Sequence, residues 1–177
     1  LTTSLNGWFG NGITVTDSGF LLNNEMDDFS IKPGYPNMYG LIGSSANQIA
    51  PNKRMLSSMT PTIVTGNDDS PYLILGTPGG STIITSVAQI IINTIDFKMD
   101  LKDAVERKRF HHQWLPDVIQ IEKHSLSNEV IDKLYTMGHE IIYRSDVGIG
   151  EANCIMIDGS TYYGVGDSRR GGRASAY

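Results

Sequence analysis

"PYLILGTPGGSTIITSVAQIIINTI", residues 71–95, is the stretch that decides the fold. It begins with an apolar, β-prone run, continues through a turn rich in Gly and Pro, and ends with apolar residues at helical spacing. The β-branched residues in 81–95 make a strand conceivable, but about fifteen residues without a turn signal favour a helix. We therefore expect a strand, a tight glycine turn and a buried helix in succession.

The segments that precede this helix predict antiparallel pairing. Residues 60–64 and 71–76 flank the turn-like "TGNDDS" and are typical of a hairpin. Residues 12–15 and 19–23 flank "TDSG" and predict a second hairpin. Strands therefore come before the first helix.

Two more helices and four short strands follow. An Asp cap and terminal cations predict a helix at residues 100–109, and a Ser cap and a terminal Gly predict one at residues 125–138. Short strands are expected at residues 119–123, 140–144, 153–158 and 162–166. This order of strands, helices and strands indicates an α+β layered fold, with residues 1–177 in a single domain.

The composition excludes several classes of protein. Asp and Glu total 19 against 14 Lys and Arg, so no basic surface indicates binding to nucleic acid or to an anionic membrane. Polar residues interrupt the longest apolar stretch, residues 83–95, which falls short of a membrane span. Cys154 is the only cysteine, so an intrachain disulfide and a multi-thiolate metal site are excluded. Its apolar neighbours predict an inert core residue.

The first residues do not look like a natural start. The sequence has no initiator Met, and "LTTSLNGWFG", residues 1–10, has neither the basic nor the apolar region of a signal peptide. We expect that processing, cleavage or disorder produced this start, and that further residues precede Leu1.

Residues 32–54 form a polar run rich in Gly and Pro, without periodicity. The run is too long for an ordinary connection between two elements. Two interpretations stay open, a lid over a binding site and a merely mobile loop.

The glycine turn "TPGGST", residues 77–82, can direct two backbone amides at one point, because Gly79 and Gly80 have no side chain to block the approach. Such amides bind negative charge, which leaves a phosphate, a substrate carboxylate or the oxyanion of an acyl-transfer intermediate as occupants. A purely structural tight turn is the remaining alternative. A nucleotide P-loop is disfavoured, because Thr82 and Ile83 stand where its Lys and Ser or Thr should follow.

A second polar constellation lies in "LLNNEMDDFS", residues 21–30. One turn there collects amides and carboxylates, at Asn23, Asn24, Glu25, Asp27 and Asp28. Carboxylates this close together need a cation, which could be Ca²⁺, although the spacing is not that of an EF-hand. It could equally be a substrate ammonium, and a solvated acidic turn is the third interpretation.

Two adjacent pairs of polar residues remain. Ser57 and Ser58 follow a basic pair and could form a turn, supply a nucleophile or clamp a ligand's charge. His111 and His112 are neighbours in sequence and therefore poorly placed to ligate one metal ion, so we expect packing and hydrogen bonding from them.

Four motifs stand in order in this chain: "LLNNEMDDFS", "PNKRMLSSMTPTIV", "GTPGGSTIITSV" and "RFHHQWLPD". Together they resemble the small, catalytic subunit of the γ-glutamyltranspeptidases, and the resemblance extends from "TSLN" to "GVGDSRR". It implies the fold of the N-terminal-nucleophile hydrolases, a four-layer αββα sandwich activated by autoproteolysis of a precursor. The nucleophile implied is the N-terminal Thr of the small subunit, upstream of Leu1, with its own α-amino group as base.

The resemblance also assigns roles to residues of this chain. Ser4 occupies the position of a family Thr whose hydroxyl supports the nucleophile. Gly79 and Gly80 correspond to the oxyanion hole. The remaining positions correspond to residues that hold the glutamyl group: Asn6, Glu25, Asp28, Ser57, Ser58 and, near the tip of the lid at 32–54, Tyr39. Glu25 and Asp28 would bind the substrate α-ammonium, and the two serines its α-carboxylate.

The function implied is acyl transfer from a γ-glutamyl amide such as glutathione, with release to water or to an amino-acid or peptide acceptor. No metal or organic cofactor is expected. The expected partner is a large subunit from the same precursor, which supplies the principal carboxylate-binding Arg, and the expected location is periplasmic or extracellular. The alternatives are a related acylase of the capsule depolymerase or cephalosporin acylase type, and a non-catalytic amino-acid-binding homologue.

Overall fold

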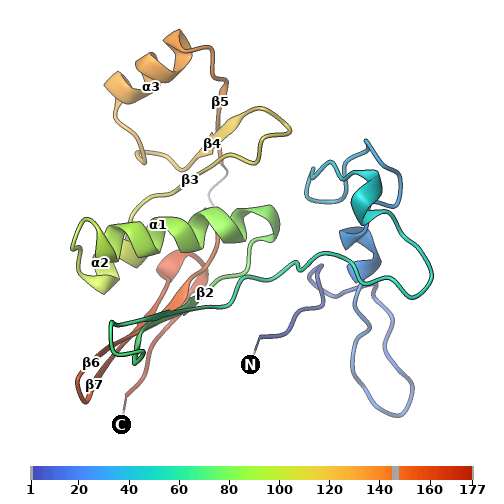
Figure 1. Ribbon diagram of the computed structural model, residues 1–177, viewed down its shortest axis with the longest axis horizontal. Coiled ribbons are helices and arrows are strands. Elements are labelled where there is room, and N and C mark those ends of the chain that lie inside the picture. Colours follow the sequence, from blue (N-terminus) through green and yellow to red (C-terminus); the bar gives the residue numbers. More distant parts are fainter. Residues whose placement is uncertain (1, 145–147, 177) are drawn as a thin grey trace. The chain divides into compact units, whose positions relative to one another are not determined.

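The computed structural model describes residues 2–144 and 148–176. The chain divides into two compact units, Leu1–Met59 and Thr60–Tyr177 (Figure 1). Every α-helix and β-strand that the structure describes lies in the second unit, whereas the first contains turns and 3-10 helices. The mixture of helices with antiparallel sheet confirms the α+β class. The single domain predicted over residues 1–177 stays a prediction.

Four antiparallel strands form the main sheet of the second unit. In sheet order they are β1 (Thr62–Thr65), β2 (Pro71–Gly76), β6 (Asn153–Asp158) and β7 (Thr161–Gly166). β1 and β2 are the hairpin predicted around "TGNDDS". Leu75 lies opposite Thr62 on one side and Cys154 on the other. Side chains alternate along a strand, so Leu73 and Leu75 face the same side of the sheet.

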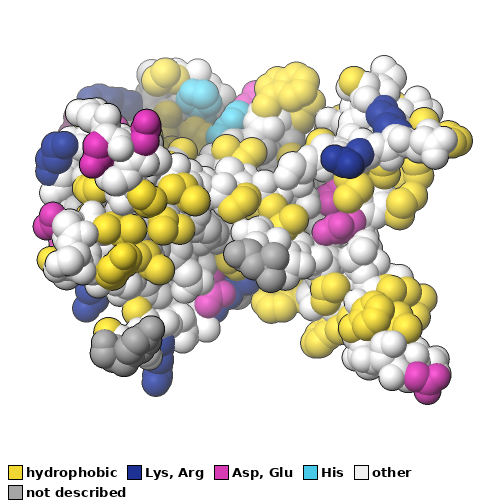
Figure 2. Space-filling view, turned by 60° about the horizontal axis from the view of Figure 1, so that its bottom comes forward, with side chains coloured by type: hydrophobic (Ala, Val, Ile, Leu, Met, Phe, Trp, Pro, Cys, Tyr) yellow, Lys and Arg dark blue, Asp and Glu magenta, His cyan; other side chains and the backbone are white. Residues whose placement is uncertain are grey.

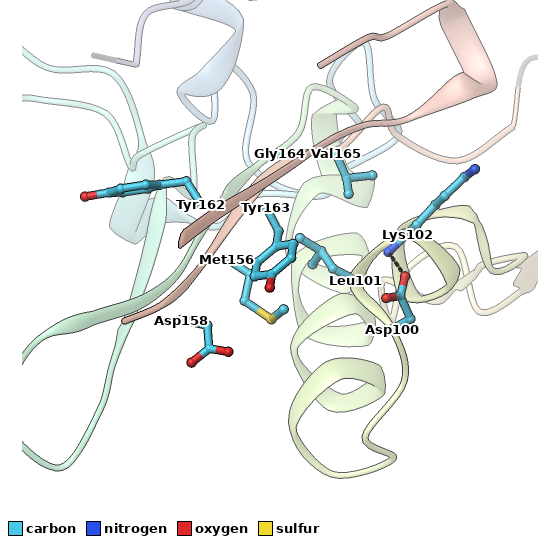
Figure 3. A pocket seen from close by; sticks show the side chains of 9 residues that line it. All are labelled: Asp100, Leu101, Lys102, Met156, Asp158, Tyr162, Tyr163, Gly164 and Val165. Atoms are coloured by element: carbon cyan, nitrogen blue, oxygen red, sulfur yellow. Dashed lines mark hydrogen bonds between the residues drawn. The ribbon is translucent and has the colours of Figure 1, made fainter. Parts of the chain in front are cut away.

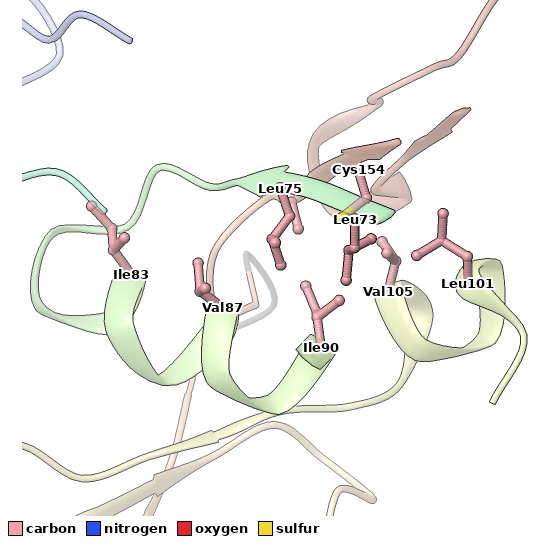
Figure 4. Packing of buried hydrophobic residues seen from close by; sticks show 9 residues of the cluster. Leu73, Leu75, Ile83, Val87, Ile90, Leu101, Val105 and Cys154 are labelled. Carbon is pink, nitrogen blue, oxygen red and sulfur yellow. The ribbon is translucent and has the colours of Figure 1, made fainter. Parts of the chain in front are cut away.

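Two helices cover that face. α1 (Ile83–Ile95) follows the short 3-10 helix η3 (Gly80–Thr82), which confirms the helix predicted after the glycine turn. α2 (Leu101–Glu106) begins after Asp100, whose side chain accepts a hydrogen bond from the Lys102 amide at 2.8 Å. The buried cluster between helices and sheet is Leu73, Leu75, Ile83, Val87, Ile90, Leu101, Val105, Ala152 and Cys154 (Figure 4). Each large apolar side chain buried there contributes about 1.5–3 kcal/mol, so this cluster is a main source of the unit's stability.

A smaller sheet contains β3 (Phe110–His111), β4 (Ile119–Ile121) and β5 (Ile141–Tyr143). β3 is antiparallel to β4, and β4 is parallel to β5 through a crossover that contains α3 (Asn128–Thr136). A second buried cluster joins this helix to the sheet: Ile119, Ile121, Ile131 and Ile141. The predicted strands and the Ser-capped helix are confirmed, whereas β3 was not predicted.

The first unit has little regular structure. It holds two 3-10 helices, η1 (Glu25–Asp28) and η2 (Ser45–Asn47). The hairpin predicted around "TDSG" is reduced to the isolated antiparallel bridge Thr14↔Leu21. In the run 32–54, a second isolated bridge, Pro36↔Ile42, closes a turn that contains Tyr39. Tyr39 therefore lies near the tip of that loop, as the resemblance implied.

The sheet face away from the helices is apolar. Ile63, Ile74 and Ile155 form one row across β1, β2 and β6, and Ile63 is 63% exposed. Tyr162 of β7, which alternates onto the same face, is 70% exposed. Figure 2 shows hydrophobic side chains gathered in patches on the face turned to the viewer. In the described part of the chain, no helix is both long and apolar enough to cross a membrane.

Candidate active site

All six predicted substrate-binding residues belong to the first unit, and Asp28 is the most deeply buried of them. It ends the 3-10 helix η1 and is only 7% exposed. Burial raises the pKa of its carboxyl group. A hydrogen bond with the Ser58 hydroxyl lowers the pKa, whereas the charges of Glu25 and Asp27 raise it. The structure therefore brings Glu25, Asp28 and Ser58 into one neighbourhood, as the predicted glutamyl site requires.

One oxygen of the Asp28 carboxylate has no hydrogen-bond donor among the described residues. Oδ2 of Asp28 is buried, and no hydrogen bond joins it to any residue that the structure describes. A buried oxygen without a donor is costly, because the group has lost its water without gaining a replacement. A substrate ammonium would supply both the donor and the positive charge. Among the described residues, no group of three or more His, Cys, Asp or Glu side chains could hold a metal ion.

Asn6 and Tyr39 form a second contact within the same unit. The Tyr39 hydroxyl donates a hydrogen bond to the backbone carbonyl of Asn6 at 2.9 Å. The backbone amide of Asn6 donates a hydrogen bond to Ser4 Oγ at 2.8 Å. Burial raises the pKa of Tyr39, and the charges of Asp28 and Asp27 raise it further. The loop that carries Tyr39 therefore reaches both the Ser4–Asn6 segment and the acidic turn.

The two serines are not equivalent. Ser57 is exposed, and its hydroxyl donates to the Met59 carbonyl at 2.9 Å. Ser58 is half-buried and interacts with the carboxylate of Asp28. A carboxylate clamp formed by both hydroxyls would need Ser57 to exchange its bond with Met59 for one with the ligand.

Gly79 and Gly80 lie in the second unit, between β2 and α1. Both have positive φ angles, 147° for Gly79 and 57° for Gly80. A Cβ atom on Gly79 would lie 2.5 Å from Thr82 Oγ1. Neither glycine amide donates a hydrogen bond to a residue in the described ranges, so both are available to a ligand. This arrangement fits the predicted anion site, because both amides lie at a helix start and neither glycine has a side chain of its own.

A second backbone segment packs against the glycine turn. The Glu151 amide donates to Thr77 Oγ1 at 2.8 Å. Gly150 has φ 71°, and a Cβ there would lie 2.8 Å from the same oxygen and 3.0 Å from Ser86 Oγ. Only a glycine allows residues 148–152 to approach the turn this closely.

Four buried charged residues hold that segment in place. The Arg109 guanidinium donates to the Ile149 carbonyl at 2.7 Å and to Asp167 Oδ2 at 2.8 Å. Asp167 Oδ2 also accepts from the Ala152 amide at 2.9 Å. The ion pairs of this network are Arg109 with Asp167, Arg169 with Asp167, and Arg169 with Glu122. Arg169 lies in the 3-10 helix η4 (Ser168–Arg170).

The network keeps its acids ionised. Burial acts to raise the pKa of Asp167, but the amides of Arg169 and Ala152 and the charges of the two arginines outweigh it, and the pKa falls below its usual value. The pKa of Glu122 is lowered in the same way, because Arg169 and the amides of Ile149 and Arg109 outweigh its burial. The sequence did not predict this network. Its only signal was the basic "GDSRR" motif near the end of the chain.

His111 and Cys154, which the sequence also singled out, are both buried in the second unit. His111 is buried, with Nδ1 2.8 Å from Thr85 Oγ1 and Nε2 2.9 Å from Gln113 Oε1, and burial lowers its pKa. Cys154 is buried in the main core, and burial raises its pKa to about 12. The predicted core position of Cys154 is confirmed, and a thiol with so high a pKa is poorly suited to act as a nucleophile, because nucleophilic attack needs the thiolate.

A cavity of about 580 Å³ lies elsewhere in the second unit, between the start of α2 and the hairpin β6–β7 (Figure 3). Met156, Tyr163 and Leu101 line it, and the Asp100 carboxylate at its edge already caps α2. None of the residues predicted for the active site lines this cavity.

Comparisons with known proteins agree with this geometry. The family model described as gamma-glutamyltranspeptidase matches residues 1–177, and the chain belongs to this family. The glutathione hydrolase proenzyme of Escherichia coli (strain K12) is 46% identical over 169 residues, which are 96% of this chain and 29% of that protein. The proenzyme of Pseudomonas aeruginosa is 46% identical over 172 residues, 95% of this chain and 30% of that protein.

The solved structures give the same result. Gamma-glutamyltranspeptidase from Pseudomonas nitroreducens, complexed with L-DON, is 44% identical with a TM-score of 0.90. The likeness covers 100% of this chain and 92% of that chain. The chain thus spans about 30% of the length of the curated relatives it matches.

Proposed function

We propose that this chain forms the catalytic half of a γ-glutamyl acyltransferase and hydrolase that acts on glutathione and other γ-glutamyl amides. The observation that carries the proposal is the buried Asp28 carboxylate beside Ser58, with its Oδ2 lacking a donor among the described residues. A γ-glutamyl group has an ammonium and a carboxylate on one carbon, and this site offers an acceptor and a hydroxyl donor next to each other. Relatives named glutathione hydrolase proenzyme support the assignment.

In the proposed complex, the α-ammonium binds Asp28, with Glu25 adding negative charge. Asp28 must be ionised for this, and a positive charge at hydrogen-bond distance favours the ionised form. The ammonium also takes over the role of donor to Asp28. The Ser58 hydroxyl is then free to turn to the α-carboxylate, with Ser57 as the second donor. Asn6, fixed through Tyr39 and Ser4, contacts the same glutamyl group.

The proposed chemistry is nucleophilic catalysis by a Thr upstream of Leu1. Its Oγ attacks the γ-carbonyl carbon while its α-amino group takes the proton. The carbonyl oxygen becomes an oxyanion, to which the amides of Gly79 and Gly80 donate. The amine leaves with a proton, and a water molecule or an acceptor amine then attacks the γ-glutamyl ester and regenerates the Thr. No metal or organic cofactor is required in this scheme.

The proposed partner is a large subunit cut from the same precursor. The apolar row Ile63, Ile74 and Ile155, with the exposed Tyr162, is suited to pack against a second sheet. Such packing would complete the four-layer αββα sandwich, because α1 and α2 already cover the opposite face. We also propose a periplasmic or extracellular location, on the ground of the family resemblance alone.

The experiment uses the complete, processed protein and a γ-glutamyl anilide as substrate. Asp28→Asn should raise KM by roughly ten- to a hundredfold, because a bond to a charged group contributes about 1.5–3 kcal/mol. Asp27→Asn is the matched control and should have a smaller effect, since Asp27 Oδ2 already accepts from the Met38 amide at 2.9 Å. Equal effects of the two changes, or a folded, processed protein without γ-glutamyl turnover, would contradict the proposal.

A further inference from the structure

The first unit contains two Asn-Gly dipeptides, Asn6–Gly7 and Asn11–Gly12. Asn-Gly is the dipeptide most prone to deamidation, because glycine has no side chain to hinder attack by its own backbone nitrogen on the preceding side chain. Asn6 is also the residue to which the proposed function assigns contact with the glutamyl group. Loss of its carboxamide would therefore change the substrate site.

Asn24 holds the Asn6–Gly7 peptide on both sides. Its Oδ1 accepts a hydrogen bond from the Gly7 amide at 2.6 Å. Its backbone carbonyl accepts from Asn6 Nδ2 at 3.4 Å, and its backbone amide donates to the Leu5 carbonyl at 3.1 Å. Asn24 thus engages both groups that react in deamidation, the backbone amide of Gly7 and the side-chain carboxamide of Asn6.

The backbone around Asn6 is fixed as well. Asn6 has a φ of 68°, a conformation that is uncommon for a residue with a side chain. The Tyr39 hydroxyl bonds to its carbonyl, and Ser4 Oγ accepts from its amide. Rotation of Asn6 toward the reactive geometry would break several of these bonds at once.

We propose that Asn6–Gly7 is a latent deamidation site and that the Asn24 side chain suppresses its reaction in the folded protein. In the reaction, the Gly7 nitrogen loses its proton and attacks Cγ of Asn6, a C–N bond forms, and ammonia leaves. Water then opens the resulting succinimide at either carbonyl, which yields aspartate or isoaspartate. The hydrogen bond from the Gly7 amide to Asn24 Oδ1 opposes loss of the proton that must leave before attack, and it fixes the orientation of the nitrogen.

Deamidation would place a new negative charge in the acidic neighbourhood of the site. Tyr39 contacts Asn6, and the charges of Asp28 and Asp27 raise its pKa, so all four residues share one electrostatic environment. The isoaspartate product would also lengthen the backbone at Asn6. Asn24 is thus a positioning residue that keeps the carboxamide intact, and its chemistry can be measured without any assay of the proposed function.

The second dipeptide provides a reference in the same molecule. Asn11 is exposed, and the Gly12 amide donates only to the nearby Phe9 carbonyl at 3.0 Å. Asn11 Oδ1 accepts from the Ile13 amide at 2.9 Å. These contacts are local to one turn, and none involves Asn24.

The experiment follows both sites by peptide mapping and mass spectrometry in the complete protein, held at mildly alkaline pH in buffer and in urea. In the wild type, Asn6 should deamidate about tenfold or more slowly in buffer than in urea, because reaction requires local opening. Asn24→Ala should raise the rate at Asn6 in buffer toward the urea rate and leave the rate at Asn11 unchanged. Asn24→Asp keeps the acceptor for Gly7 and should stay close to the wild type.

Three results would overturn the proposal. The first is an equal rate at Asn6 in buffer and in urea. The second is an Asn24→Ala protein that deamidates at Asn6 like the wild type, or that accelerates at both sites alike, which would indicate general loosening. The third is an Asn24→Asp protein as fast as Asn24→Ala, because the acceptor would then have no protective effect.

Discussion

The guanidinium of Arg109 and the carboxylate of Asp167 form an ion pair at 2.8 Å in which the side chains are 2% and 0% exposed. Asp167 also holds the Ala152 amide, and Arg109 holds the Ile149 carbonyl. The pair therefore fixes the backbone segment that packs against the glycine turn. Removing Asp167 would leave the Arg109 charge buried without an ion-pair partner among the described residues.

We predict that Asp167→Ala lowers the free energy of unfolding by about 3–5 kcal/mol, the usual loss when a buried pair is broken. Urea unfolding of the second unit, monitored in the complete protein, would measure it. The control is Glu129→Ala, which breaks the exposed pair of Glu129 with Lys133 on α3. That change should cost only about 0.3–0.5 kcal/mol. Similar losses for both variants would show that burial of the Arg109 pair has no special weight.

The same network predicts loss of stability in acid. The pKa values of Asp167 and Glu122 lie below their ordinary values of 3.8 and 4.5. Their contribution to stability is fully present above those ordinary values and is lost as the pH falls below them, through the lowered folded-state values. Unfolding free energy should therefore decline steeply over that acid range. Glu122→Gln should flatten the decline, and an unchanged pH profile in this variant would argue against the linkage.

Ligand binding should also depend on pH, in this case because the pKa of Asp28 is raised and not lowered. Its pKa is raised by burial, so ligand binding through its ionised form should weaken as the pH falls through that raised value. L-glutamate carries the same α-amino and α-carboxylate groups as the substrate, so its inhibition constant can be measured as a function of pH. The acidic limb of that profile, where inhibition weakens as the pH falls, would report the pKa of Asp28. Ser58→Ala removes a bond that lowers the pKa, so the limb should move to higher pH. Asp28→Asn should abolish it, and a limb that persists in this variant would assign it to another group.

The elements that could be predicted from the sequence are those with a local signal. The helix after the glycine turn is confirmed, because Ile83, Val87 and Ile90 repeat at helical spacing and are buried. The helix predicted at residues 100–109 ends at Glu106 instead. The cations at 107–109 are typical of a helix end, but Arg109 lies beyond the helix. Arg109 is buried, and its backbone amide donates to Glu122 Oε2 at 2.8 Å.

Features that depend on long-range contacts had no such signal. β3 has two residues and an exposed Phe110, so no alternation marked it as a strand. The hairpin predicted around "TDSG" is reduced to one bridge, since its Ile13 and Phe20 remain exposed and bury little apolar surface. The ion network joins Arg109, Glu122 and Asp167, and no window of sequence contains all three. The candidate site was found because its motifs are short and continuous.

The proposed catalytic role of Gly80 can be separated from its backbone strain by comparing two glycine variants. Gly80 has a φ of 57°, so Gly80→Ala should lose roughly 1 kcal/mol of stability and also disturb an amide of the proposed oxyanion hole. Gly138 is the matched control, because its φ is 91° and a Cβ there would meet nothing within 4 Å. Gly138→Ala should show a similar loss of stability and normal turnover.

Only Gly80→Ala should then lower kcat, by about 10²–10³, the usual effect of losing one oxyanion donor. KM should change little, because the donor acts on the tetrahedral intermediate, and slow acylation should appear in a single-turnover measurement. Melting and kinetics must be recorded on the same sample of the complete protein, so that a folding defect is not mistaken for a catalytic one. If Gly80→Ala and Gly138→Ala are equally active, Gly80 serves the turn alone and its amide is not an oxyanion donor.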